Sequence, residues 1–134
     1  MAGTLEVRIR RERDIGIIAP GGSDYINIAG GELIAEACDE LLARDVYHLL
    51  LNLKKCRLIN CRSLSSLLEV VEKVKARQGQ MAFCCAGPVI SKVFRITRSL
   101  QSAALYNTEQ EALQALSEAP RTKAGTSRRK LDRT

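Results

Sequence analysis

The chain has 134 residues, 46% of them hydrophobic and 27% charged, a balance that excludes a disordered or membrane-spanning protein and suits one domain, which we expect over residues 1–118. The net charge is +6, and residues 119–134 carry +5 of it through six Lys and Arg side chains against Asp132. We expect this basic tail at 119–134 to be disordered and to bind no specific nucleic acid, because it has no aromatic residue on which a base could stack.

The first half of the chain predicts two strands, a helix and a third strand. Residues 5–10 alternate apolar and polar side chains, which is typical of an edge strand with one solvated face. Residues 15–19 form a second apolar run that pairs with the first as a hairpin, and Pro20, Gly21 and Gly22 are expected to close it. Helical periodicity covers 31–44, and the run 46–53 is apolar enough for a central strand covered on both faces.

The second half predicts alternating helices and strands after a polar, irregular segment at 54–62. The expected elements are a helix from Leu64 to near Gly79, with Gly79 as its C′ residue, a strand at 81–86, a helix from Pro88, a strand at 103–106 and a last helix opened by the Thr108 and Glu111 capping box. This order predicts an α/β fold with a four- to five-stranded mixed, mostly parallel sheet and about four helices.

The cysteines indicate a reducing environment. There are five of them, Cys38, Cys56, Cys61, Cys84 and Cys85, an odd number in a chain large enough to fold without disulfides. No run approaches the roughly 18 apolar residues of a membrane span, and charged residues precede any apolar signal segment. We therefore expect a cytoplasmic protein with reduced thiols, in which Cys84 and Cys85 serve packing.

Three features that could support catalysis or ligand binding do not form a site. The one histidine, His48, falls inside the predicted central strand, where a general base could not reach a substrate. Cys56 and Cys61 lack the second ligand pair of a zinc site. The glycine pairs at 21–22 and 30–31 match neither the GxGxxG dinucleotide-binding pattern nor the P-loop. We expect no enzyme activity, no cofactor and no metal.

Four segments resemble the STAS domain family in order and spacing. Leu50 to Leu53 resembles the family's Val-Leu-Asp-Leu strand, and Leu58-Ile59 its apolar pair before Asp-Ser-Ser-Gly-Leu. Residues 81–89 and 106–113 resemble its penultimate strand and its closing segment. The resemblance covers roughly residues 5–116 and implies an anti-sigma factor antagonist that works by binding a protein.

Laid onto this chain, the family's Asp falls on Asn60, its phosphorylated Ser on Cys61, its next Ser on Arg62 and its Gly on Ser63. A thiol is no substrate for a serine kinase, so the family's phosphorylation switch is expected to be absent. Two alternatives stay open. Phosphorylation moves to Ser63, Ser65 or Ser66, of which Ser63 is the best placed, or the Ser63 hydroxyl is an N-cap. The Cys61 thiol is either a redox sensor or a small filler of the serine position.

The expected function is partner binding through Asn60, Cys61, Arg62 and Ser63, together with Ser23 and Tyr25. The resemblance implies an anti-sigma factor or switch kinase as the partner, and hence signal transduction that regulates bacterial transcription. The alternatives are a nucleotide- or anion-binding domain that uses a helix N-terminus such as that near Pro88, and a STAS-like subunit of a transport or signalling scaffold. Monomer and dimer both stay open.

Overall fold

The computed structural model describes residues 4–96 and 103–118, so the expected tail at 119–134 lies outside the described residues. Within them, no helix has the length and apolar character that crossing a bilayer requires. The elements, in chain order, are β1 (Glu6–Glu12), β2 (Ile15–Gly21), β3 (Tyr25–Ile26), α1 (Ile28–Ala43), β4 (His48–Asn52), β5 (Leu58–Ile59), α2 (Cys61–Ala76), β6 (Gln80–Cys84), α3 (Pro88–Ile96), β7 (Ala104–Tyr106) and α4 (Glu109–Glu118).

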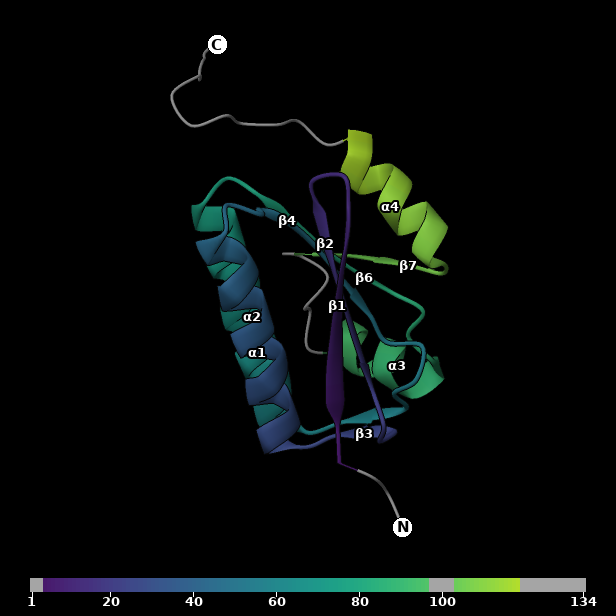
Figure 1. The fold of residues 1–134 in the computed structure, drawn as a ribbon. Helices are drawn as coiled ribbons and strands as arrows, with labels where there is room; N and C mark the ends of the chain where they lie inside the picture. Colours follow the sequence, from purple (N-terminus) through teal and green to yellow (C-terminus); the bar gives the residue numbers. More distant parts are fainter. Residues whose placement is uncertain (1–3, 97–102, 119–134) are drawn as a thin grey trace.

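Five strands form one mixed, mostly parallel sheet in the order β1-β2-β4-β6-β7 (Figure 1). β1 and β2 are an antiparallel hairpin, and the remaining neighbours pair in parallel. The predicted α/β fold, with its sheet and its helices, is confirmed. β1 lies at the edge and β4 at the centre, as the alternation of one and the apolar run of the other predict.

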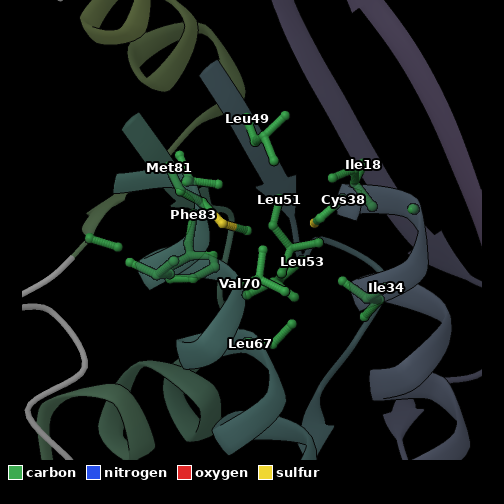
Figure 2. Packing of buried hydrophobic residues seen from close by; sticks show 14 of the residues in the cluster. Ile18, Ile34, Cys38, Leu49, Leu51, Leu53, Leu67, Val70, Met81 and Phe83 are labelled. Carbon is green, nitrogen blue, oxygen red and sulfur yellow. The ribbon is translucent and has the colours of Figure 1, made fainter. Parts of the chain in front are cut away.

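The helices cover both faces of the sheet. α1 and α2 pack side by side against one face, and α4 lies on the other (Figure 1). Because neighbouring residues of a strand point to opposite faces, Leu49 and Leu51 of β4 join the larger core under α1 and α2, whereas Leu50 joins a smaller core under α4. Figure 2 shows the larger core, with Val70 of α2 facing Leu51 and Phe83. β4 is therefore covered on both faces.

Neither Pro20 nor Gly21 closes β2, and this prediction is wrong; of the three predicted residues only Gly22 lies beyond the strand. β2 continues to Gly21 and stays paired with β1 over its whole length. β4, however, pairs only with Ile15 to Ile18 of β2. Pro20 is therefore paired with β1 only. On its other side the described part of the chain has no strand, so the missing N–H of Pro20 interrupts no hydrogen-bond ladder there.

α1 and α2 end in the same way, with a residue of positive φ just after the C-cap: Asp45 at 65° and Gln78 at 63°. After α2 the amide of Gly79 donates to the carbonyl oxygen of Val74 at 2.9 Å, which completes a Schellman motif. The prediction that Gly79 is the C′ residue is wrong, because Gln78 holds that position. Gly79 is required for another reason: a Cβ there would overlap the carbonyl oxygen of Tyr47.

Candidate functional site

The segment at 54–62 is not wholly irregular, and this expectation needs correction. It contains β5, which pairs in parallel with β3 as a second, two-stranded sheet. The register sets Tyr25 opposite Leu58 and Ile26 opposite Ile59. Each strand leads through one cap residue into its helix, so α1 and α2 begin at the same end of the molecule, next to β3 (Figure 1).

Asn60 is the N-cap of α2 and also links that helix to β3. Its side-chain oxygen accepts a hydrogen bond from the backbone N–H of Arg62 at 2.8 Å. Its amide nitrogen donates to the hydroxyl of Tyr25 at 3.1 Å. The aspartate of the family pattern could provide the same cap, but its carboxylate could only accept from the Tyr25 hydroxyl, whereas the asparagine amide donates to it.

Cys61 and Arg62 are the first two residues of α2, and both are exposed. Arg62 forms no ion pair with any other described residue. The nearby cation Arg57 is by contrast paired with Asp24 at 3.5 Å. The opening turn of α2 therefore presents a thiol and an uncompensated positive charge to solvent.

Ser63 is only 1% exposed and faces α1 rather than solvent. Its hydroxyl donates to the carbonyl oxygen of Asn27, the N-cap of α1, at 2.5 Å. A Cβ at Gly31 would lie 2.7 Å from the Ser63 hydroxyl oxygen, so the two helices meet here without room for one more carbon. The N-cap interpretation of Ser63 is wrong. Its phosphorylation stays a prediction, and it would require the two helices to separate.

Ser23 precedes β3, and Tyr25 is the first residue of this strand, beside the start of α2. The Ser23 hydroxyl accepts from the backbone N–H of Tyr25 and donates to its carbonyl oxygen, both at 3.2 Å. Tyr25 is 39% exposed. Sequence reasoning missed Leu58, which is 42% exposed directly across the ladder from Tyr25; only the pairing of two two-residue strands, which carry no periodicity, could have indicated it.

We name this surface the docking patch and define it by six residues, Ser23, Tyr25, Leu58, Asn60, Cys61 and Arg62. It combines two exposed large hydrophobic side chains, Tyr25 and Leu58, with a cation, Arg62, that has no ion-pair partner in the described part of the chain. The hydrogen bonds of Asn60 and Ser63 tie it to both helices. Of the predicted partner-binding residues, only Ser63 lies beneath the surface.

The other candidate side chains serve packing. His48 is 4% exposed and belongs to β4. Burial raises the pKa of Cys38 to about 12 and that of Cys56 to about 11, which disfavours the reactive thiolate. The described residues hold no cluster of three or more side chains able to bind a metal ion.

A polar cluster at the start of α4 was missed from the sequence. The carboxylate of Glu109 accepts from Arg10 of β1 and from the amide of Asn52, each at 2.8 Å. Burial alone would raise the pKa of Glu109, but the hydrogen bonds from Arg10 and Asn52 hold it below its usual value. The three residues are far apart in the chain, so no spacing rule connects them.

Comparisons with known proteins agree with this architecture. An anti-sigma factor antagonist from Mycobacterium paratuberculosis is 17% identical with a TM-score of 0.76, and the match covers 86% of this chain and 96% of that one. An anti-sigma-factor antagonist (STAS) domain protein from Planctomyces limnophilus is 22% identical, with a TM-score of 0.75 and coverage of 84% and 98%. The Bacillus anti-sigma factor antagonist SpoIIAA in its unphosphorylated form is 16% identical with a TM-score of 0.72, and the match covers 87% of this chain and 100% of that one.

No curated protein matches the chain. The solved structures are too distant in sequence to show more than the fold. The STAS domain model, however, matches residues 6–112, which include all seven strands and the first three helices described above. The chain belongs to the STAS domain family.

Proposed function

We propose that this STAS domain is a regulatory module that acts by binding another protein, in the manner of an anti-sigma factor antagonist, and that it is not an enzyme. The observation that carries the proposal is the docking patch, where exposed Tyr25 and Leu58 face each other across the β3–β5 ladder and exposed Arg62 lies in the first turn of the helix that follows β5. Aromatic and arginine side chains are enriched where protein interfaces bind most strongly. The similar structures named anti-sigma factor antagonists support the partner class, an anti-sigma factor or switch kinase in a bacterial cytoplasm, with transcription as the regulated process.

The charge of Arg62 specifies the partner surface further. Arg62 has no ion-pair partner among the described residues, and burying an unpaired guanidinium in an interface costs several kcal/mol. The partner must therefore place a carboxylate opposite Arg62 and an apolar surface opposite Tyr25 and Leu58. We propose an acidic patch beside an apolar pocket on the partner.

The thiol of Cys61 removes the family's means of release. A phosphate on a serine adds about two negative charges, enough to repel an acidic partner surface. Cys61 stands exposed at the first position of α2 but offers no hydroxyl for a kinase. We therefore propose that binding is not switched by phosphorylation at this position.

Charge reversal at Arg62 tests the patch. Tagged wild-type protein, Arg62→Glu and Lys75→Glu are used to capture partners from lysate of the source organism, and captured proteins are identified by mass spectrometry. Lys75 is a matched control because it is an exposed cation on the same helix, in its last turn. We expect wild type and Lys75→Glu to capture an anti-sigma factor or switch kinase, and Arg62→Glu to lose it by at least tenfold. Equal capture by all three proteins, at equal melting temperatures, would reject the docking patch.

A second substitution tests the missing switch. Cys61→Ser restores a hydroxyl at the exposed first position of α2. We expect the captured kinase with ATP to phosphorylate Cys61→Ser and to leave the wild type unmodified, as read from intact mass. If Cys61→Ser stayed as unmodified as the wild type, the proposal that Cys61 is what removes the switch would be contradicted. Phosphate on the wild-type protein at Ser63 would instead mean that another serine replaces the family's site.

One observation favours an anion site as a second candidate function. A half-open cavity of about 130 Å³ is lined by Arg8, Lys54, Lys55 and Asn52, with Glu6 as its acidic member. This volume holds about four water molecules, room for a phosphoryl group rather than a whole nucleotide. It lies at the carboxyl ends of β2 and β4, and Pro88, the predicted anion site, is not among its lining residues. A thermal-shift titration with inorganic phosphate, ATP and GTP tests it, since a ligand at 100 times its Kd stabilises by about 2.7 kcal/mol; no shift with any of them rejects it.

A further inference from the structure

Two adjacent thiols, Cys84 and Cys85, touch at the carboxyl end of β6. The Cys85 thiol donates to the sulfur of Cys84, and the two sulfur atoms lie 3.3 Å apart. Cys84 is fully buried in the core under α4, whereas Cys85 is half-buried and has a φ of 65°. The expectation that both are packing residues accounts for the first thiol but not for the second, which turns back onto its neighbour.

We propose that Cys84 and Cys85 form a reversible disulfide with each other by exchange with a small-molecule disulfide. Cys85, the more accessible thiol, attacks as the thiolate, so that a mixed disulfide forms and half of the reagent leaves as a thiol. Cys84 then loses its proton to water and attacks the sulfur of Cys85, and the second half leaves as a thiol. Two protein thiols are oxidised, and one disulfide is reduced to two thiols.

The order of these steps follows from burial. Burial raises the pKa of Cys84, which makes it the poorer first nucleophile. Once Cys85 carries the mixed disulfide, contact between the two side chains replaces an encounter in solution and favours the second step.

Reversibility follows from the covalent chain. Cα atoms joined by a trans peptide are about 3.8 Å apart, whereas disulfides usually join Cα atoms about 4.4–6.8 Å apart. A ring closed between adjacent cysteines is therefore strained and easily reduced. The dithiol is the resting state in a reducing compartment, and the disulfide forms only under oxidation.

The backbone of the pair holds two neighbouring strands. The N–H of Leu53 donates to the carbonyl oxygen of Cys84 at 2.9 Å, and the N–H of Cys85 donates to that of Tyr106 at 3.1 Å. Ring closure changes the backbone between these two groups. Oxidation is therefore expected to weaken both hydrogen bonds, one at the end of β4 and one to β7.

Peptide mapping of the full chain after treatment with glutathione disulfide tests the proposal. Cleavage after Arg77 and Lys92 places both cysteines in the peptide 78–92, and cleavage after Arg57 and Arg62 isolates Cys61 in 58–62. We expect 78–92 to lose two hydrogen atoms in mass, to carry no glutathione and to recover on reduction. We also expect faster amide exchange at Leu53 and Cys85 in the oxidised protein.

The exposed thiol of Cys61 is an internal control for the reagent. If 58–62 gains glutathione while 78–92 keeps two free thiols or stops at one glutathione adduct, the proposal is rejected. Cys84→Ser is expected to leave Cys85 with glutathione attached, and Cys85→Ser to leave Cys84 reduced. Equal reactivity of the remaining thiol in both variants would contradict the assigned order.

Discussion

The contact between Gly31 and Ser63 fixes how closely α1 and α2 approach. The Ser63 side chain occupies the space that a Cβ at Gly31 would need, and its hydroxyl bonds to the cap residue of the other helix. Periodicity predicted both helices but could not reveal this contact, because it joins residues from separate helices. For the same reason the sequence could not show that Ser63 is buried: it follows the exposed Arg62 directly in the chain, and only the contact with α1 removes it from the surface.

Gly31→Ala is expected to destabilise the fold by about 1–3 kcal/mol, because the added methyl group overpacks the junction of α1 and α2. Urea unfolding followed by circular dichroism measures this. Gly87→Ala is the matched control, since a Cβ at Gly87 would meet no atom within 4 Å. If the two variants lose the same stability, the packing argument at Gly31 fails.

At the scale of elements, β4 and the four helices were predictable because their apolar patterns extend over several residues. β3 and β5 were not, because a two-residue strand shows no alternation and depends on its partner for hydrogen bonds. The docking patch could be predicted in part for this reason. The place of Cys61 and Arg62 in this patch could be predicted, because a helix start is recognisable in the sequence. The exposure of Leu58 could not, because it depends on the pairing of β5 with β3, which sequence alone does not reveal.

α4 is attached to the sheet by Glu109 as well as by apolar contacts, and this attachment depends on pH. The pKa of Glu109 is lowered, so the carboxylate stabilises the fold at pH values above the unfolded pKa of about 4.3, and the effect is lost as the pH falls through the lower folded pKa. Glu109→Gln should cost about 1 kcal/mol near pH 7, because Arg10 and Asn52 lose a charged acceptor. Unfolding curves between pH 3 and 8 should show this difference shrinking in acid.

Glu36→Gln is the control for this measurement, because Glu36 is exposed on α1 and forms no ion pair with another described residue. Removing this carboxylate should leave the free energy of unfolding near pH 7 close to that of the wild type, because no ion pair is lost. A constant difference between wild type and Glu109→Gln across the whole range would show that the carboxylate charge does not contribute.

At the scale of the whole molecule, one sheet serves two cores. Successive residues of β4 point alternately into the core under α1 and α2 and into the core under α4. The two cores therefore share one strand, and we expect neither to unfold while β4 stays paired in the sheet. The sequence indicated a strand buried on both faces through its apolar run. It could not divide the residues between the faces without knowing which helices cover each.

Leu67→Ala and Leu116→Ala test whether the two cores unfold together. Leu67 is buried in the larger core and Leu116 in the smaller one, and each substitution should cost about 2–5 kcal/mol. Tyrosine fluorescence and far-ultraviolet circular dichroism should report one coincident transition for both variants. Leu33→Ala, at an exposed position of α1, should change little. Separate transitions in Leu116→Ala would contradict a shared sheet.

The hydrogen bonds from Asn60 to Tyr25 and from Ser63 to Asn27 tie the loop-borne part of the docking patch to the ends of two long helices. If a partner binds the docking patch as we propose, these hydrogen bonds hold the patch in place beforehand, so binding should order few further residues and cost little conformational entropy. Association would then depend on how often the two molecules collide in the right orientation. Because we propose that Arg62 faces an acidic partner surface, we expect the association rate constant to fall as ionic strength rises.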